Sequence, residues 1–363
     1  MSDAIPEQMR AVVVHGPDDY RLERRPVPEP GPDDLLLRVE AAGVCASDVK
    51  CFHGAAKFWG DEHRSQYVQP GVIPGHEFTG VVVAGQRAAL EAREVSLGDR
   101  VVCEQIVPCG RCRCCQRGQY WMCEPHEMFG FRGHDGAMAG YVLVPGRARV
   151  HRISAELAPQ HAALAEPLSC ALHAVERADI QFEDTVVVAG CGAIGVGLIA
   201  GVRQKNPLRL IALDLNDDKL ELGRRCGADV VINVAREDAV ARVKELTGGH
   251  GADVYLNGTG AAPAVEQGLH LLRRLGRYVE YSVFGTDVSV DWSIISDDKE
   301  LTIAGAHLGP HCWPPAIKML EDGSVPAAEI CTHQVGLDRF AEGLDLVADS
   351  GGSSVKVSIL PHS

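Results

Sequence analysis

The stretch Thr185-Val-Val-Val-Ala-Gly-Cys-Gly-Ala-Ile-Gly195 decides the fold of this chain. Its β-branched run predicts a buried strand, and its three glycines match the G-x-G-x-x-G pattern that opens a helix in dinucleotide-binding sheets. Gly190 permits a tight turn, Gly192 allows close approach of a pyrophosphate, and Gly195 lets the helix pack on the strand. The pattern therefore predicts a strand, a phosphate-binding turn and a helix.

An acidic residue follows this fingerprint at the expected spacing. Ala193 and Ile194 open the helix, so their free backbone N–H groups would face the phosphates. The next strand ends at Asp214, 19 residues after Gly195, where such folds place a carboxylate that accepts from the adenosine ribose. Because an acid would also repel a 2′-phosphate, the sequence predicts NAD in preference to NADP. The alternative is that Asp214 only begins a turn.

From about Leu164 onward, helical patterns alternate with short apolar strands. The expected helices are Leu168–Arg177, Asp218–Cys226, Ala239–Leu246 and Ala262–Leu272. The expected strands, besides the one at Thr185–Ala189, are Leu208–Leu213, Val230–Asn233, Asp253–Leu256 and Gly276–Tyr281. This alternation predicts a doubly wound parallel sheet of the α/β class.

The first 150 residues have a different texture, because short β-branched runs are separated there by Gly and Pro. These runs are Ala11–Val14, Leu35–Val39, Gly80–Val83, Arg100–Val102 and Tyr141–Val144, and they predict an antiparallel β domain. Ser354–Leu360 again resembles a strand. We therefore expect a β domain over residues 1–166, a dinucleotide-binding domain over 167–306, and a return to the first domain over 307–363.

Composition narrows the classes of function. The 363 residues include 35 basic and 49 acidic side chains, a net charge of −14, which speaks against nucleic acid as a partner. The longest apolar run, Val186–Val202, contains five glycines and suits a strand-turn-helix better than a membrane span. Residues 1–7 do not resemble a signal peptide. We expect a soluble cytoplasmic protein with no membrane partner.

Thirteen cysteines are present, and five of them lie between Cys109 and Cys123. Cys109, Cys112, Cys115 and Cys123 have the spacing C-x2-C-x2-C-x7-C. Four thiolates in a short loop predict a closed tetrahedral zinc site with a structural role. An iron–sulfur cluster is the rival interpretation, but the fourth spacing and the missing proline count against it. Cys114 is left as a spare thiol.

A second group of metal-ligating residue types is dispersed along the chain. It consists of Cys45, His76, Glu77 and Glu166. A thiolate, an imidazole and a carboxylate with one open position are the composition of a catalytic zinc site. Spacing alone makes this grouping weak, since each residue could have an ordinary structural role.

The motifs taken together resemble the zinc-containing medium-chain alcohol dehydrogenases over almost the whole chain. The resemblance is carried by six segments: Gly43-Val-Cys-Ala-Ser-Asp48, Pro74-Gly-His-Glu-Phe-Thr-Gly80, Gly98-Asp-Arg-Val101, the four-cysteine loop 109–123, Glu166-Pro-Leu168 and the fingerprint ending in Asp214. It implies a GroES-like β catalytic domain combined with a Rossmann domain. It also implies two zinc ions per subunit, one catalytic and one structural.

The resemblance implies roles for individual residues. Cys45, His76 and either Glu77 or Glu166 would hold the catalytic zinc, and glutamate at 166 resembles the polyol and threonine dehydrogenase branch. Ser47 matches the residue that bonds the substrate oxygen and passes its proton outward. Many relatives carry the next relay histidine at the position of Lys50, so Lys50, His53 or water would complete the exit here. Lys219 resembles a second ribose contact, and Lys356 resembles a pyrophosphate contact.

The substrate expectation also rests on resemblance. The segments around Cys103 and Gly118 are most similar to those of erythritol and threitol dehydrogenases, which implies oxidation of a short polyol such as erythritol or threitol to erythrulose. His134, His307 and His311 are expected to border the substrate. Sorbitol, butanediol and threonine remain alternatives, as do a zinc-free reductase and a non-catalytic binding protein. Bacterial relatives suggest a homotetramer over a dimer, paired near Tyr278–Val283 and a strand at Val288–Val290.

Overall fold

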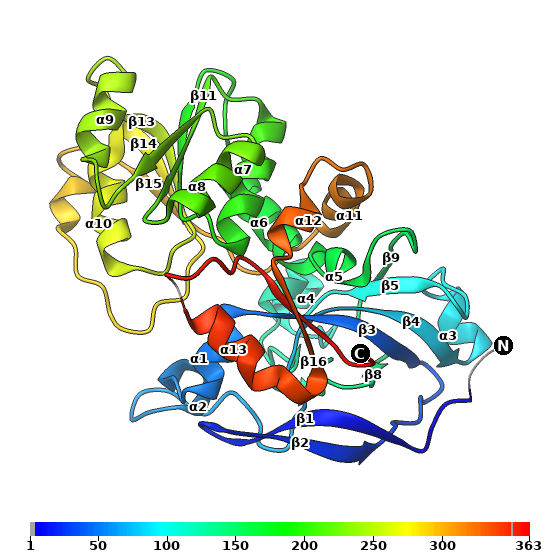
Figure 1. Ribbon diagram of the computed structural model, residues 1–363. Coiled ribbons are helices and arrows are strands. Elements are labelled where there is room, and N and C mark those ends of the chain that lie inside the picture. Colours follow the sequence, from blue (N-terminus) through cyan, green and yellow to red (C-terminus); the bar gives the residue numbers. More distant parts are fainter. Residues whose placement is uncertain (1–3, 350) are drawn as a thin grey trace. The chain divides into compact units, whose positions relative to one another are not determined.

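The computed structural model describes residues 4–349 and 351–363, and these form two compact units (Figure 1). The first unit contains residues up to Glu166 together with Trp313–Asp322 and Cys331–Ser363. The second contains Pro167–Cys312 and Gly323–Ile330. The segment 307–363, which we expected to return as a whole, is thus shared between the units.

Local packing explains this division of the last segment. In the first unit, the Trp313 ring is 1% exposed and stacks on the His151 ring at 5.6 Å between centroids. In the second unit, Arg225 Nη1 lies 2.5 Å from Glu329 Oε2. This ion pair links the helix at 217–225 to the helix at 327–330. The chain therefore crosses between units at two further points that hydrophobic patterning does not mark.

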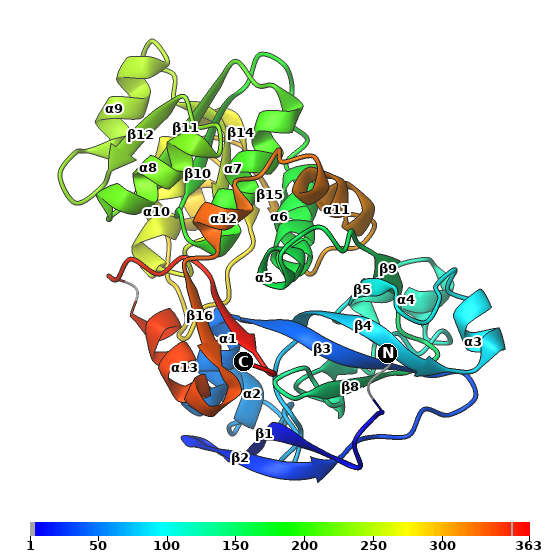
Figure 2. The ribbon, with the colours of Figure 1, turned by 45° about the vertical axis from the view of Figure 1, so that its right-hand side comes forward.

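The second unit is built on a six-stranded parallel sheet with the order β12-β11-β10-β13-β14-β15, and Figure 2 shows its first three strands. The strands are β10 (Thr185–Ala189), β11 (Arg209–Asp214), β12 (Val230–Asn233), β13 (Ala252–Asn257), β14 (Leu272–Glu280) and β15 (Thr302–Gly305). This order is the doubly wound arrangement of dinucleotide-binding domains. The predicted fold class is therefore confirmed for this unit.

The helices that accompany these strands are α6 (Ala165–Arg177), α7 (Ala193–Lys205), α8 (Asp217–Arg225), α9 (Ala239–Leu246), α10 (Ala262–Leu271) and α12 (Ala327–Ile330), with a 3₁₀ turn η2 (Trp292–Ile294). Helices α7 to α10 connect successive strands, as the alternating pattern predicted, while α6 precedes β10 and α12 follows β15 in the chain. The strand expected at Val288–Val290 does not form. The edge of the sheet is instead β15, because residues 302–305 pair with β14.

The first unit has a seven-stranded sheet with the order β16-β17-β3-β4-β5-β9, and β8 pairs with β3. The strands are β3 (Leu35–Val44), β4 (Glu77–Gly85), β5 (Arg100–Cys103), β8 (Tyr141–Val144), β9 (Val150–Arg152), β16 (His333–Gly336) and β17 (Val357–Leu360). Strand β17 pairs with β3 although they lie far apart in the sequence (Figure 1). Two separate pairs complete the strands: β1 (Gln8–Gly16) with β2 (Asp19–Pro26), and β6 (Met128–Phe129) with β7 (Gly133–His134).

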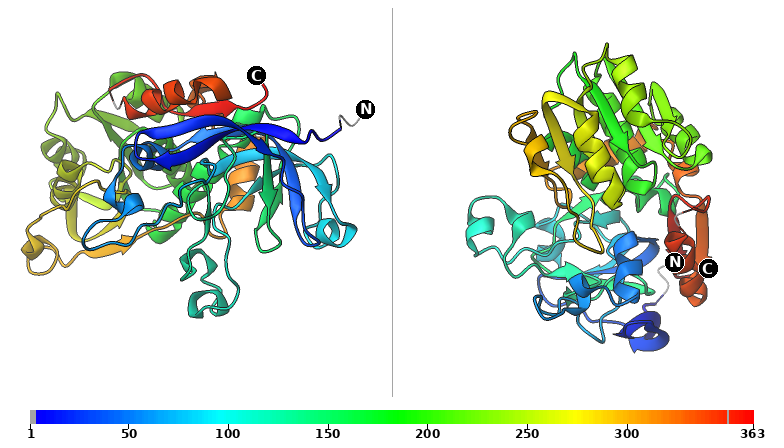
Figure 3. Two further views of the ribbon diagram at one scale, coloured as in Figure 1. Left: turned by 90° about the horizontal axis from the view of Figure 1, so that it is seen from below. Right: turned by 90° about the vertical axis from the view of Figure 1, so that its left-hand side faces the viewer.

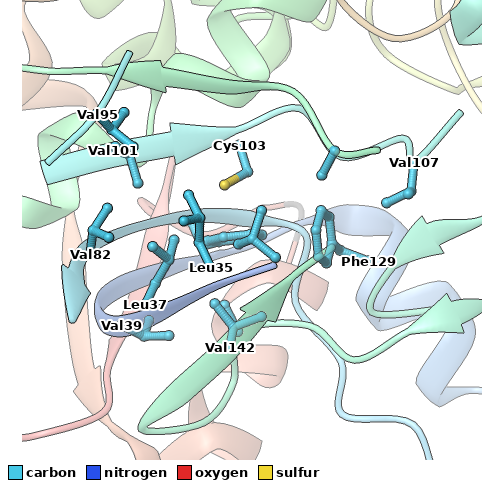
Figure 4. Packing of buried hydrophobic residues seen from close by; sticks show 14 of the residues in the cluster. Leu35, Leu37, Val39, Val82, Val95, Val101, Cys103, Val107, Phe129 and Val142 are labelled. Atoms are coloured by element: carbon cyan, nitrogen blue, oxygen red, sulfur yellow. The ribbon is translucent and has the colours of Figure 1, made fainter. Parts of the chain in front are cut away.

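A cluster of buried apolar residues lies in this β unit. Leu35 and Leu37 of β3 point toward Val101 and Cys103 of β5, and all four side chains are 0% exposed (Figure 4). Phe129 closes one end of the cluster. Alternating residues of the expected strands supply this core, which is what period-two patterning predicts.

Short helices surround the sheet of the first unit. They are α1 (Ala46–Phe52), α2 (Ala56–Trp59), α3 (Arg87–Glu91), α4 (Arg113–Gln116), α5 (Pro159–Ala162), α11 (Trp313–Glu321) and α13 (Phe340–Ala348), with 3₁₀ turns η1 (Tyr120–Met122) and η3 (Leu337–Arg339). Figure 3 shows the four-cysteine segment as a lobe that extends from this unit. Among the described residues, no helix has the length and apolar character that a bilayer crossing requires.

Candidate functional site

The four-cysteine lobe brings Cys109, Cys112, Cys115 and Cys123 together, with their sulfur atoms within 4.8 Å of one another. Backbone N–H groups point at these sulfurs: Cys109 N lies 3.2 Å from Cys123 Sγ, and Cys112 N lies 3.3 Å from Cys109 Sγ. Gly110 adopts a φ of +73°, which permits the sharp turn between the first two cysteines. Cys114 is not a member of the set.

The lobe favours the thiolate forms of two of its four cysteines, whereas burial raises the pKa of Cys115 to about 12 and also raises that of Cys123. Hydrogen bonds from the backbone N–H groups of Cys115 and Glu124 lower the pKa of Cys112 to about 6. Similar bonds from the backbone lower the pKa of Cys109. Four converging sulfurs with no other donor type match a closed, structural zinc site.

A second set of donors lies in the β sheet of the first unit. Cys45 lies at the amino-terminal cap of α1, His76 follows the turn at Gly75, and Glu77 begins β4. Their ligand atoms also lie within 4.8 Å of one another. A thiolate, an imidazole and a carboxylate fit a zinc ion with an open position. The sequence left Glu77 and Glu166 as alternatives, and this compact set contains Glu77.

Asp48 holds this set in place and was missed as a functional residue by the sequence reasoning. Its Oδ2 accepts a hydrogen bond from Cys45 N at 2.9 Å, and its Oδ1 lies 3.5 Å from His76 Nδ1. Burial alone would lower the pKa of His76, but the negative charges of Asp48 and Cys45 raise it well above its usual value. The same negative surroundings would favour a divalent cation. The only signal in the sequence was an acid three residues after a ligand.

Lys356 is the partner of Glu77 in this structure. Its ammonium group forms an ion pair with the Glu77 carboxylate and donates to the Val44 carbonyl at 3.1 Å. Burial disfavours the charged form, but Glu77 outweighs it and raises the pKa of Lys356. Lys356 is 3% exposed, so its charge is committed to the metal set. The expected contact of Lys356 with a pyrophosphate stays a prediction.

Glu166 lies in the first turn of α6 and is 5% exposed. Its Oε1 accepts a hydrogen bond of 2.5 Å from Gln105 Nε2, and Gln105 is 1% exposed. A buried amide thus fixes the orientation of a buried carboxylate. Gln105 carried no recognisable signal in the sequence, because a single glutamine belongs to no metal-binding pattern.

In the second unit, the glycine turn has the form that a dinucleotide requires. Gly190 has a φ of +91°, and a Cβ on Gly195 would overlap the Gly190 carbonyl oxygen. A Cβ on Gly192 would meet nothing within 4 Å, so the space in front of the amino terminus of α7 is open. Ala193 and Ile194 form the first turn of that helix. These residues fit a bound pyrophosphate.

Asp214 ends β11 beside this turn. Its Oδ2 accepts from Cys191 N at 2.7 Å and its Oδ1 accepts from Asn216 N at 2.9 Å. Each carboxylate oxygen has a second lone pair, so both the turn and a ribose hydroxyl can be bound. Lys219 lies on the neighbouring helix α8 and is 9% exposed.

Comparison with known proteins assigns the family. Residues 31–155 match the model of the alcohol dehydrogenase GroES-like domain, and residues 193–322 match that of the zinc-binding dehydrogenases. Over 362 residues, 62% are identical to an erythritol/L-threitol dehydrogenase of Mycolicibacterium smegmatis, covering 99% of this chain and 100% of that protein. The chain belongs to the zinc-binding alcohol dehydrogenase family. It is therefore a dehydrogenase that uses zinc and a nicotinamide cofactor.

Further relatives agree with this assignment of the dehydrogenase. A sorbitol dehydrogenase of Halalkalibacterium halodurans is 31% identical, covering 97% of this chain and 99% of the relative. A protein of Sinorhizobium meliloti 1021, described as a zinc-binding dehydrogenase and solved with NADP, superimposes with a TM-score of 0.87 at 29% identity. That comparison covers 98% of this chain and 100% of the other. The predicted family is thus confirmed.

The candidate relay residues of the dehydrogenase lie on or beside α1. Ser47 and Lys50 are half-buried on this helix, and burial lowers the pKa of Lys50. His53 caps the end of α1, and its Nδ1 lies 2.8 Å from Asp18 Oδ1 in an exposed position. The structure thus ties His53 to a surface carboxylate.

The three histidines expected near the substrate do not all lie in one unit. His134 is on β7 in the first unit, and its Nε2 lies 3.3 Å from Glu127 Oε2. His307 and His311 belong to the second unit, where His311 adopts a φ of +61°.

Proposed function

We propose that this dehydrogenase oxidises a secondary hydroxyl of a short polyol to a ketone, with erythritol or threitol giving erythrulose as the favoured reaction. The observation that carries the proposal is the 62% identity, over almost the whole chain, to an erythritol/L-threitol dehydrogenase. The reaction removes a hydride from carbon and a proton from oxygen. A dehydrogenase of this kind therefore has to supply a hydride acceptor and a path for the proton.

The residues of the first unit would divide this work. When bound, zinc supplies Lewis acidity toward the substrate hydroxyl and the nicotinamide supplies the hydride acceptor. Cys45, His76 and Glu77 would hold the metal, with Asp48 orienting His76 and Lys356 orienting Glu77. Cys109, Cys112, Cys115 and Cys123 would hold a second, structural zinc ion.

The proton path would begin at Ser47. We propose that Ser47 Oγ accepts the proton of the substrate hydroxyl and passes its own proton outward. Lys50, whose pKa is lowered by burial, and His53, paired with Asp18, are the candidate acceptors beyond it.

The test is a panel of C4 to C6 polyols, butanediol, threonine and simple alcohols, each assayed with NAD and NADP by the absorbance of the reduced cofactor. We expect the largest kcat/KM for a C4 polyol with NAD. If the enzyme prefers sorbitol, butanediol or threonine, that compound replaces the C4 polyol as the assigned substrate. Turnover of unbranched monoalcohols alone would overturn the polyol assignment.

Asp214 is proposed to select NAD over NADP. We expect Asp214→Asn to lower the ratio of kcat/KM for NAD to that for NADP by at least about tenfold, because the change removes a negative charge that repels the 2′-phosphate. Asp218→Asn is the matched control, since Asp218 is an exposed acid in the same turn region. Equal use of both cofactors by the unmodified enzyme would contradict this role.

Glu166 is proposed to serve the catalytic zinc, either as a ligand or beside one. We expect Glu166→Gln to lower kcat by about 10- to 100-fold without unfolding the protein, because groups that support a metal site have effects of that size. Glu156→Gln changes an exposed glutamate of the same unit and should leave kcat unaltered. Unchanged turnover in Glu166→Gln would remove Glu166 from the site.

We further propose a homotetramer in which dimers pair through the edge strand β15. The support is that β15 lies at the sheet edge and exposes Ile303 to 44%, which leaves an apolar edge for a second copy. Light scattering should give four chains, and Ile303→Lys should yield smaller species.

We also propose a cytoplasmic location, supported by thirteen cysteines that form no disulfide, to be tested by cell fractionation.

A further inference from the structure

A hydrogen-bond network around the Glu280 carboxylate lies at the carboxyl ends of β13 and β14. Glu280 Oε2 accepts hydrogen bonds from Asn257 Nδ2 at 2.9 Å and from the Tyr278 hydroxyl at 3.0 Å. Glu280 Oε1 accepts from Ser282 N at 2.7 Å. These donors are an amide, a phenol and a backbone N–H group, and all three are neutral. The network therefore fixes the carboxylate firmly without cancelling its charge.

The phenol remains neutral under the conditions in which the enzyme works. Tyr278 is 3% exposed, and burial together with the nearby Glu280 carboxylate raises its pKa far above the usual value. Asn257 is 0% exposed. Glu280 itself is only half-buried, so its charge acts on a ligand bound at the carboxyl ends of β13 and β14.

The network is continuous with the dinucleotide turn. Asn257 Oδ1 accepts from Thr259 Oγ1 at 2.8 Å, and Thr259 Cγ2 would lie 3.1 Å from a Cβ on Gly190. In addition, Gly258 N donates to Ala189 O at 3.0 Å. The end of β13 thus packs directly against the fingerprint.

The strand order predicts which half of a dinucleotide faces Glu280. In this order β11 and β12 lie on one side of β10, and the later strands β13 to β15 lie on its other side. A dinucleotide binds across the crevice between β10 and β13, where the strand order reverses. Asp214 on β11 marks the adenosine side. The ends of β13 and β14 therefore lie on the side of the other mononucleotide, which carries the nicotinamide.

We propose that Glu280 makes the enzyme favour oxidised over reduced nicotinamide dinucleotide. The oxidised nicotinamide ring carries one positive charge, and the ring is neutral after it has accepted a hydride. A fixed carboxylate at this sheet edge stabilises the first form and has little effect on the second. This inference rests on the proposed cofactor, and it makes Glu280 a specificity-determining residue that biases binding toward alcohol oxidation.

The experiment measures the dissociation constants of NAD+ and NADH by calorimetry. The purified enzyme carries its zinc ions and contains no bound dinucleotide or substrate at the start. We expect Glu280→Gln to raise the Kd of NAD+ relative to that of NADH by roughly three- to tenfold, the size expected for a half-buried charge acting over several ångströms. Tyr278→Phe removes the hydroxyl's two hydrogen bonds, with Glu280 and with Asn257, but keeps the charge, so it should leave the ratio unchanged. Asp214→Asn acts on the half that both forms share and should shift both constants equally.

The outcomes separate the inference from the proposed function. An equal change of both constants in Glu280→Gln would mean a purely structural role and would overturn the inference. Failure of the unmodified enzyme to bind either form would overturn the cofactor assignment itself. If Glu280→Gln does not fold, the pair Glu280→Asp and Glu280→Asn repeats the comparison with a shorter side chain, and the same ratio shift is expected between them.

Discussion

The His76→Ala variant is expected to lose at least about 1,000-fold in kcat/KM for the polyol, because a metal site of this kind contributes several kcal/mol of transition-state stabilisation. His76 is 4% exposed and belongs to the set that also contains Cys45 and Glu77. Removing the imidazole leaves a thiolate and a carboxylate without their shared partner. Elemental analysis should find that bound zinc falls from two ions per chain to one.

A matched control comes from the surface of the same unit. The His63 side chain is 80% exposed, so His63→Ala should retain both zinc ions and full activity. Near-normal turnover by His76→Ala, or two zinc ions in that variant, would show that this set is not the catalytic metal centre.

The second large effect concerns stability. We expect Cys112→Ser to lower the free energy of unfolding by at least about 3 kcal/mol, because the binding energy of a structural zinc ion is also folding energy. The Cys112 Sγ atom accepts hydrogen bonds from the backbone N–H groups of Cys115 and Glu124, each at 3.5 Å. Denaturant titration with and without a chelator should show that the variant has lost the chelator-sensitive part of the transition.

Cys114 provides the control for this loop. It lies two residues from Cys112 in the same lobe but outside the set of four sulfurs. Cys114→Ser should change the free energy of unfolding by less than about 0.5 kcal/mol, the range of ordinary surface substitutions. Equal destabilisation by both variants would indicate that the lobe depends on general packing and not on a metal ion.

The sequence predicted the elements whose signals are local. The glycine fingerprint places β10 and α7, because each glycine answers a steric demand within a few residues. The strand at residues 185–189 was predicted with its observed bounds. The prediction of the edge strand was wrong. The apolar alternation at 288–290 gave no indication that residues 302–305 would pair with β14 instead.

The site was predictable where its residues form motifs and not where they meet through the fold. Cys45 and His76 each lie in a short motif, so their residue types could be read directly. Lys356 was expected only as a pyrophosphate contact, and its bond to the Val44 carbonyl, 312 residues earlier in the chain, was not predicted. Only the pairing of β17 with β3 brings them together, and no pattern of spacing encodes that pairing.

This pairing also sets an order of events during protein synthesis. The second unit is complete once Ile330 has left the ribosome, whereas the first unit still lacks residues 331–363. Those residues provide β16, β17 and the Lys356 ammonium group that faces Glu77. Since domains generally fold as units while the chain emerges, the dinucleotide-binding unit can mature first. Glu77 in the metal-binding set then gains its Lys356 partner only when translation reaches β17.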